Sequence, residues 1–404
     1  MSQVGRRHRP GHLLWSRVVS FLPSPLWFSA TAVAPQLADE LGLDAGAISG
    51  LTLAVQLGFV VGALVLAISD LADIVPSRTL FAISAVVGAA VNAMLLTIGP
   101  GSEGWIFPIR FITGAALAGV YPAGLKVMSG WFKSGRGLGL GALVGALTVG
   151  SAGPHLIHGF GLEWKGVVGT ASVLAIMAAG LLYFLVTDGP YETEPHRFDW
   201  RSIGDVIGNR GFQLSTYGYL GHMWELYAMW TWTAAFLAAS AREAGVSESF
   251  VPTATFFIIA IGGVGAWLFG RWADRYGRTR LAGISLVASG TAAVLTPLVF
   301  GLSPFIVVGL FLFWGFTVVA DSAQFSAMVT EVSDDATRGT ALALQTAVGF
   351  LLTLVTIRGV PVVVELLGWR WAFPLLALGP VIGIEAMIRL KRSSYATSLA
   401  GGRG

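Results

Sequence analysis

The sequence contains no cysteine, so it forms no disulfide bond and offers no thiolate for metal binding or catalysis. It is also poor in charge, because charged residues make up 12% of the chain whereas an average soluble domain has about 25%. Hydrophobic residues make up 54% instead, and the mean hydropathy is +0.72. These shortages exclude a soluble protein and predict a protein of the lipid bilayer.

Motifs of soluble enzymes are missing as well. The sequence has no glycine-rich phosphate loop that ends in Lys and Ser or Thr, which argues against an ATP-driven pump, and no cluster of metal ligands. We therefore expect no enzyme activity and no cofactor or metal. The isoelectric point near 9.3 would suit nucleic acid, but the basic residues are scattered over short loops. We expect no nucleic-acid partner.

Long apolar runs fill most of the chain. A transmembrane helix needs about 20 mostly apolar residues. We predict twelve such spans, six in each half of the chain. Those of the first half are Leu13–Ala34, Gly46–Ile68, Thr79–Ile98, Trp105–Met128, Leu138–Leu156 and Gly166–Thr187. Those of the second half are Phe212–Ala239, Val251–Gly270, Leu281–Gly301, Ser303–Val329, Thr340–Pro361 and Trp371–Leu390.

The longest polar stretch lies between the sixth and seventh spans. It divides the chain into an N-terminal six-helix bundle (1–187), a linker (188–211) and a C-terminal six-helix bundle (212–404). If the N-terminus is cytosolic, only Lys165, Arg242 and Arg370 of the loop basic residues face outward, which fits the positive-inside rule. We expect both termini and the linker in the cytosol, with the first span kept as an uncleaved helix.

A short charged signature follows the second span and the eighth. The second copy is Gly270–Arg280, with the sequence GRWADRYGRTR, and the weaker first copy is Ser69–Arg78, with the sequence SDLADIVPSR. Asp73 and Asp274 are 201 positions apart. Arg136 and Arg338 begin a second matching pair of segments at an offset of 202, and Trp164 matches Trp369 at an offset of 205. Three matches in the same order indicate an internal duplication.

Twelve spans in two parallel halves, the signature after helices 2 and 8 and the long linker together resemble the major facilitator superfamily of secondary transporters, in its bacterial twelve-helix type. The resemblance covers about residues 12 to 392. It implies an all-α integral membrane protein with two pseudo-symmetric six-helix bundles. The first signature departs from the family pattern, since Ser69, Ile74 and Pro76 replace glycine, arginine and glycine.

The signature also suggests a gate on mechanical grounds. Gly270 allows close helix crossing and Gly277 allows a tight turn. Asp274 can face the positive end of a helix, and the arginines can bridge to acidic groups such as Glu331. The alternative is a marker of topology without a gating role. The gate residues that we predict are Asp73, Arg78, Arg136, Gly270, Asp274, Arg275, Gly277, Arg278 and Arg338.

Few ionisable residues lie inside the spans, and such residues usually face a wet cavity or a partner because burial in lipid costs about 3 kcal/mol or more. Those best placed are Arg110 in helix 4, His222 and Glu225 in helix 7 and Asp321 in helix 10. In the resembled family, helices 1, 4, 7 and 10 line the central cavity. Arg110 and Gly114 match an arginine-x-x-x-glycine pattern in helix 4 that is associated with proton coupling in this family.

His222 and Glu225 are three residues apart and therefore share a helix face. We expect Glu225 to carry a proton and His222 to modulate it, with a purely structural His–Glu hydrogen bond as the alternative. We expect Trp224, Tyr227 and Trp27 to line the cavity. Asp321 and Gln324 would form part of the pathway, or Asp321 would pair with Lys126, whereas Arg358 and Arg17 would snorkel toward lipid headgroups.

Helix 5 carries Gly141, Gly145 and Gly153-Pro154, which predict a smooth packing surface and a kink. The sequence thus predicts a monomeric secondary transporter of the bacterial inner membrane that moves a small organic solute, coupled to protons. An organic anion that meets Arg110 is one candidate solute. A multidrug or metabolite exporter that exchanges protons is the alternative function, and a non-transporting receptor with the same fold is a further one.

Overall fold

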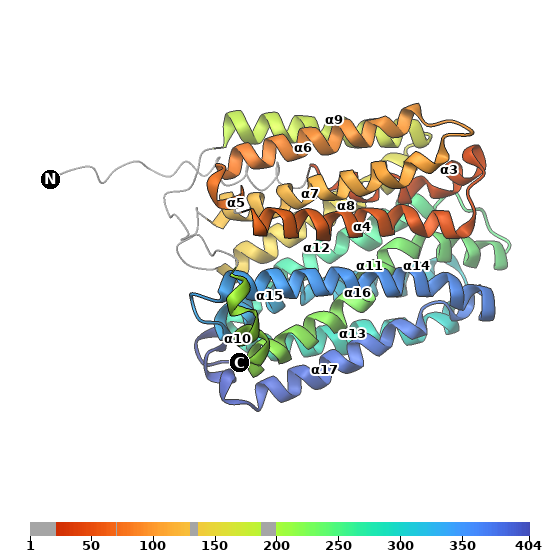
Figure 1. The fold of residues 1–404 in the computed structure, drawn as a ribbon. Coiled ribbons are helices and arrows are strands. Elements are labelled where there is room, and N and C mark those ends of the chain that lie inside the picture. Colours follow the sequence, from red (N-terminus) through yellow and green to blue (C-terminus); the bar gives the residue numbers. More distant parts are fainter. Residues whose placement is uncertain (1–21, 70, 130–135, 187–198) are drawn as a thin grey trace.

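The computed structural model describes residues 22–69, 71–129, 136–186 and 199–404. Within these ranges the chain is helical and contains no β-strand. The long helices run side by side, and α5 (Leu71–Ile74), α10 (Ile203–Gly208) and the C-terminus lie at one end of the bundle (Figure 1). We call this the signature end, because both signatures lie there, and the other end the opposite end.

The described helices follow the order expected from the sequence. The first half contains α2 (Pro25–Phe28), η1 (Thr31–Val33), α3 (Ala34–Leu41), α4 (Ala45–Ile68), α5, α6 (Ser77–Ala93), η2 (Met94–Thr97), η3 (Glu103–Trp105), α7 (Ile106–Ser129), α8 (Arg136–Gly159) and α9 (Trp164–Leu185). The second half contains η4 (Trp200–Ser202), α10, α11 (Arg210–Glu243), α12 (Val251–Tyr276), α13 (Arg278–Val299), α14 (Pro304–Ala320), α15 (Ser322–Val332), α16 (Arg338–Leu367), η5 (Trp369–Trp371), η6 (Pro374–Ala377), α17 (Leu378–Lys391), η7 (Ser394–Thr397) and η8 (Leu399–Gly401).

Nine stretches of the described residues are long and apolar enough to cross a bilayer. They match nine of the predicted spans: 46–68, 77–97, 103–124, 164–185, 251–276, 278–299, 304–332, 338–367 and 369–391. Helices α8 and α11 occupy the places of the fifth and seventh predicted spans. The first predicted span begins outside the described residues, and its described part is the broken run of α2, η1 and α3.

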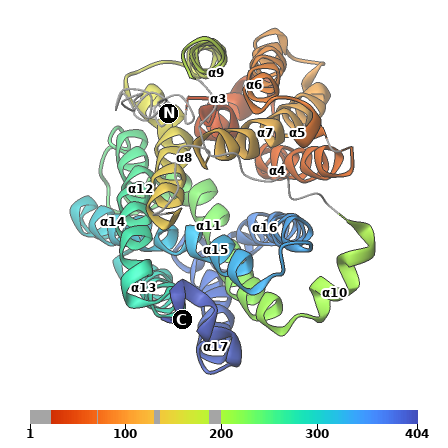
Figure 2. The ribbon, with the colours of Figure 1, turned by 90° about the vertical axis from the view of Figure 1, so that its left-hand side faces the viewer.

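Seen from the signature end, the helices form two groups (Figure 2). Helices α4, α6, α7 and α9 belong to one group, and α11, α13, α16 and α17 to the other. The two halves of the chain meet where α8 of the first half packs along α12 of the second, and where α4 of the first packs on α16 of the second. The domain boundaries at 187 and 212 stay a prediction.

Glycine brings α8 and α12 into close contact. A Cβ atom on Gly145 would lie 2.8 Å from the carbonyl oxygen of Gly263, and one on Gly263 would lie 2.8 Å from that of Gly145. A Cβ on Gly141 would lie 2.6 Å from the carbonyl oxygen of Ala266 and 3.3 Å from the Cα of Gly270. Helix 5 therefore uses its glycines to pack against the other half of the molecule.

The third repeat match makes equivalent contacts at the opposite end. Lys165 Nζ lies 3.0 Å from Glu40, at the end of helix 1, and Arg370 Nη2 lies 3.9 Å from Glu243, at the end of helix 7. The Trp164 indole and Lys165 both donate hydrogen bonds to Glu40 and hold the pKa of this exposed carboxyl below its usual value. Helices 1 and 7 thus each carry an acidic residue paired with the basic residue of this match, at a longer distance in the second half.

The second signature is helical rather than a loop, since α12 continues through Asp274 to Tyr276. Only Gly277 breaks the helix, with φ of 93° and ψ of 139°. A φ in this range strains any residue with a Cβ atom, so the expected use of glycine in a turn applies at this position. The described part of the linker packs on the second half, where the backbone N–H of Asp199 donates to Thr340 Oγ1 at 2.9 Å.

Candidate functional site

An aromatic layer joins the two halves near the middle of the bundle. Trp27 lies 5.8 Å from Tyr227 and 5.6 Å from Phe350, measured between ring centroids, and Phe59 lies 4.6 Å from Phe350. The layer consists of Trp27, Phe28 and Phe59 from the first half and Tyr227, Trp230 and Phe350 from the second. Two of the predicted cavity residues, Trp27 and Tyr227, therefore meet across the interface.

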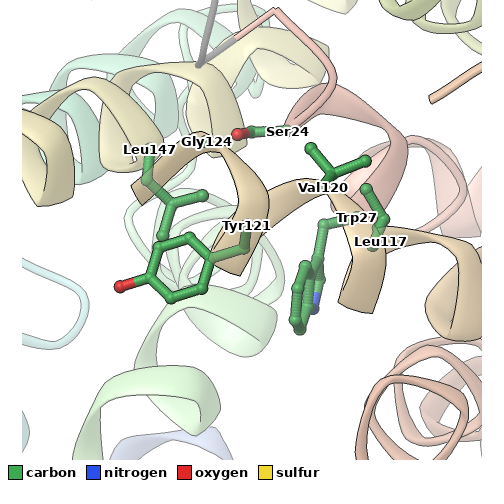
Figure 3. Close-up of a pocket in the computed structure, with 7 residues that line it drawn as sticks. All are labelled: Ser24, Trp27, Leu117, Val120, Tyr121, Gly124 and Leu147. Atoms are coloured by element: carbon green, nitrogen blue, oxygen red, sulfur yellow. The ribbon is translucent and has the colours of Figure 1, made fainter. Parts of the chain in front are cut away.

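A small pocket lies beside Trp27, on the side of the aromatic layer nearer the signature end. Trp27 and Tyr121 both contribute to its wall (Figure 3). Its lining residues come from helices 1, 4 and 5 and are Ser24, Trp27, Leu117, Val120, Tyr121, Gly124 and Leu147. None of these seven residues carries a charge. The pocket therefore offers aromatic and aliphatic surface with a few hydroxyl groups.

Arg110 is fully buried and binds the break in helix 1. Its Nη1 donates to the carbonyl of Leu26 at 3.0 Å, to Ser29 Oγ at 3.1 Å and to Asn92 Oδ1 at 2.9 Å. Its Nη2 donates to the carbonyl of Trp27. These carbonyls lie at the C-terminal end of α2, where backbone acceptors lack helical partners and favour a cation. Arg110 thus makes its hydrogen bonds to neutral oxygen atoms of the first half.

Glu225 points into the second half. Ser289 Oγ of α13 donates to Glu225 Oε2 at 2.8 Å, and Trp314 Nε1 of α14 donates to Oε1. Residues two apart on a helix point about 200° away from each other, so Glu225 and Tyr227 lie on opposite faces of α11. Glu225 therefore faces α13 and α14, whereas Tyr227 faces the first half, and the proton-carrying role of Glu225 stays a prediction.

His222 pairs with a different carboxylate from the one expected. Its Nδ1 lies 2.8 Å from Asp321 Oδ1, and both side chains are buried. Asp321 lies at the break between α14 and α15, so helix 10 is discontinuous at the residue that binds helix 7. The His222–Glu225 hydrogen bond that the spacing suggested does not occur here, because His222 binds Asp321 while Glu225 binds Ser289 and Trp314.

Two other predicted pathway residues lie elsewhere. Trp224 packs against Gly379, and its Nε1 donates to the carbonyl of Leu375 at 3.2 Å, so it faces α17 and not the interface. Gln324 accepts a hydrogen bond from Arg278 Nη1 at 3.0 Å and belongs to the signature end. The sequence assigned each residue to the right helix, but helical spacing could not show which neighbouring helix each side chain meets.

Arg278 is the centre of the second signature. It donates to both carboxylate oxygens of Glu331 at 2.7 to 3.0 Å, and its Nη2 lies 3.1 Å from Asp274. The C-terminal segment joins this group, since the N–H of Ala400 donates to Glu331 at 3.0 Å and Arg403 Nη1 donates to the carbonyl of Asp274 at 3.0 Å. All these contacts lie within the second half.

The remaining gate residues make local contacts. Arg275 lies over the ring of Tyr276, 5.3 Å from its centroid, and Arg338 donates to the carbonyl of Thr330 at 3.1 Å. Arg78 donates to the carbonyl of Val186 at 3.2 Å. The side chains of Asp73 and Arg136 lie outside the described residues. The gating role of the signature stays a prediction.

A contact between the halves at the opposite end was not expected. Arg358 Nη1 of α16 donates to Ser49 Oγ of α4 at 3.1 Å, and a Cβ on Gly46 would lie 3.4 Å from the same nitrogen. Arg358 therefore does not extend to lipid headgroups as predicted from its place near a helix end. It faces the other half because α4 and α16 are neighbours.

Comparison with known proteins agrees with this architecture. The family model described as Major Facilitator Superfamily matches residues 18–253 and 226–400. Among solved structures, "Crystal structure of nucleoside transporter NupG (D323A mutant)" is similar with a TM-score of 0.71 and 16% sequence identity, covering 94% of this chain and 99% of that one. A comparison with curated protein sequences found no match. At this identity the likeness to the solved structure concerns the fold alone.

Proposed function

Because the chain belongs to the Major Facilitator Superfamily, we propose that it is a secondary transporter that moves a small organic solute by alternating access and is driven by protons. We place it as a monomer in the cytoplasmic membrane of a bacterium, with both termini and the linker in the cytosol. A nucleoside, the solute class for which the similar solved transporter is named, is one such small organic solute.

The observation that carries the proposal is the set of buried titratable groups on and beside α11. Glu225, His222 and Asp321 are each at most 1% exposed. An ionisable group at such depth is expensive to bury and usually has a function in transport. Proton uptake by either carboxylate removes a negative charge from the inside of the second half. It also weakens the hydrogen bonds that this carboxylate accepts from a neighbouring helix.

Helix α11 also explains how protons and solute would act on one equilibrium. One face of α11 carries Glu225, which binds α13 and α14, and the opposite face carries Tyr227, which meets the first half. Coupling requires that each ligand binds the alternative arrangements of the same element with different affinity. We propose that protonation on one face of α11 alters the contact of its other face with Trp27, and so links proton and solute movement.

The proposal predicts a specific loss in two variants. Glu225→Gln and Asp321→Asn retain side-chain shape but cannot titrate, so both should abolish uphill accumulation driven by an imposed proton gradient. Both should retain downhill exchange, because exchange needs no net proton movement. Transport in proteoliposomes, with a solute found by a thermal-shift screen, measures the two activities separately.

Glu385→Gln is the matched control, since among the described residues the exposed Glu385 forms its ion pair with Arg389 of its own helix, at 2.7 Å. It should accumulate solute normally. If Glu225→Gln concentrates solute with the normal pH dependence, Glu225 is not the coupling site and Asp321 takes its place. If both variants do so, proton coupling through α11 is refuted.

A further inference from the structure

Gln56 is a fully buried amide without a hydrogen-bond partner among the described residues. It lies in the middle of α4, is 0% exposed, and neither its Oε1 nor its Nε2 is paired. A buried polar atom left unpaired costs about 1–3 kcal/mol. Such a group needs a hydrogen-bonding partner that the described residues do not supply. For Gln56 both the amide oxygen, an acceptor, and the amide nitrogen, a donor, need one.

Helical spacing places Gln56 at the aromatic layer. It follows Thr52 by four positions and precedes Phe59 by three, so the three residues share one face of α4. Thr52 Oγ1 lies 2.8 Å from Thr31 Oγ1 of helix 1, and Phe59 touches Trp27 and Phe350. The amide therefore belongs to the face that meets helix 1 and α16.

The neighbouring indole has the same deficit. Trp27 Nε1 is buried and lacks a partner in the described part of the chain, although the ring of Trp27 lines the pocket. Aromatic side chains offer a flat apolar face together with a polar edge. Gln56 and Trp27 thus supply donors, one acceptor and a stacking surface at the junction of helix 1 with α4 and α16.

The guanidinium of Arg110 meets this junction only through neutral oxygen atoms of the described residues. The seven residues that line the pocket are neutral, and the guanidinium of Arg110 donates to Leu26, Trp27, Ser29 and Asn92. Its Nε has no partner among the described residues, but Nη1 and Nη2, the two ends of its fork, are both occupied by these oxygens. An anion bound here would therefore be buried without the paired hydrogen bonds of a free guanidinium, which is unfavourable.

We propose that the transported solute is uncharged and contains a flat ring whose edge presents a hydrogen-bond donor next to an acceptor. Gln56 recognises this edge with both atoms of its amide, as glutamine does when it binds a base edge with two hydrogen bonds. Trp27 packs against the ring. This inference rests on the proposed transport function and names its substrate class.

Binding to the purified full-length protein tests the class directly. Radiolabelled uracil is the probe, because its ring carries adjacent N–H and C=O groups. We expect saturable binding, and we expect 1,3-dimethyluracil, which lacks the N–H donors, to displace uracil only at concentrations about tenfold higher or more. Benzoate, a flat anion, should not displace it.

Variants test the assignment to Gln56. Gln56→Leu should weaken uracil binding by about tenfold or more, while Gln213→Leu, whose amide is bonded at the signature end, should bind normally. Without ligand, Gln56→Leu should unfold at the wild-type temperature or above it, because the change removes an unpaired amide. Gln56→Asn, which keeps a shorter amide, should bind with intermediate affinity and serves if the leucine variant does not fold.

Four results would overturn the inference: wild-type affinity in Gln56→Leu, equal displacement by 1,3-dimethyluracil, displacement by benzoate, or no uracil binding at millimolar concentration. Proteoliposomes separate this inference from the proposed function. Uracil exchange that ignores a pH gradient would refute proton coupling and retain the substrate class. Gradient-driven uptake of benzoate but not uracil would do the reverse.

Discussion

Arg110 and Trp314 hold equivalent positions in the two halves, 204 residues apart, and each fastens the helix that leads its half. Arg110 donates to the broken helix 1 and to Asn92, while Trp314 donates to Glu225 of α11 beside Ser289. The duplication has thus preserved a polar link among three helices but has changed its chemistry. The first half places a guanidinium in this link, and the second half a carboxyl group.

This comparison gives Arg110 a structural role that a variant can measure. Arg110→Met would remove the donor that now binds the carbonyl of Trp27 and one of the two donors of Asn92 Oδ1, leaving Asn92 Oδ1 with Ser29 Oγ alone. We expect a loss of stability of about 2 kcal/mol or more, seen as a lower midpoint of thermal unfolding in detergent. Arg110→Lys should recover only part of it, since an ammonium group cannot reproduce the fork of the guanidinium.

The control for this prediction is Arg389→Met. Its exposed ion pair with Glu385 contributes about 0–1 kcal/mol, so the midpoint should barely move. Equal midpoints for Arg110→Met and wild type would show that Arg110 does not hold helix 1.

Among the secondary-structure elements, helices 1 and 10 are interrupted near functional groups. Helix 1 breaks between α2 and α3, next to Trp27, and helix 10 breaks at Asp321. Interrupted helices in transporters present backbone groups and allow one part of a helix to move separately from the other. By contrast α4 and α16 are continuous over 24 and 30 residues and meet across the interface.

The contact between α4 and α16 predicts a latch at the opposite end. Arg358→Gln should weaken the hydrogen bond to Ser49 and favour separation of the two helices there. In this cysteine-free chain, a cysteine in place of the buried Thr52 should then react several-fold faster with a thiol reagent. Arg370→Gln is the control, because Arg370 binds Pro297 and Glu243 of its own half. An unchanged rate in Arg358→Gln would rule out the latch.

At the scale of the whole molecule, the two halves touch along α8 with α12 and along α4 with α16. The first contact is nearly backbone to backbone through glycine, and the second includes Arg358 and the Phe59–Phe350 pair of the aromatic layer. The rest of the aromatic layer joins helix 1 to α11. Motion of one half against the other must repack these two seams. The charged cluster of the second signature, where Arg278, Glu331 and the C-terminal segment meet, belongs to one half and can move with it.

Orientation in the membrane is a property of the whole molecule that the basic residues predict. A single cysteine at position 196, in the linker, should resist an impermeant thiol reagent added to intact cells and react after the membrane is opened. A cysteine in place of Ser247, in the exposed loop before α12, should react in intact cells. Labelling of position 196 from outside would reverse the predicted topology.

The sequence alone determined the membrane class, the order of the helices and the family, because long apolar runs and a repeated charged signature are local patterns. It also identified Arg110, His222, Glu225 and Asp321 as the buried charges of interest, since cost in the bilayer depends on residue type and depth. Close packing through the glycines of helix 5 followed from their spacing as well.

Only the tertiary structure decided which groups are partners. The spacing of His222 and Glu225 placed them on one turn, but the neighbours of α11 determine that His222 meets Asp321 and that Glu225 meets Ser289 and Trp314. Likewise the sequence could not show that Gln56 lacks partners or that Arg358 binds the other half, because both facts depend on helices that are distant in the chain. Helical periodicity gives the direction of a side chain relative to its own helix, and packing alone supplies what lies in that direction.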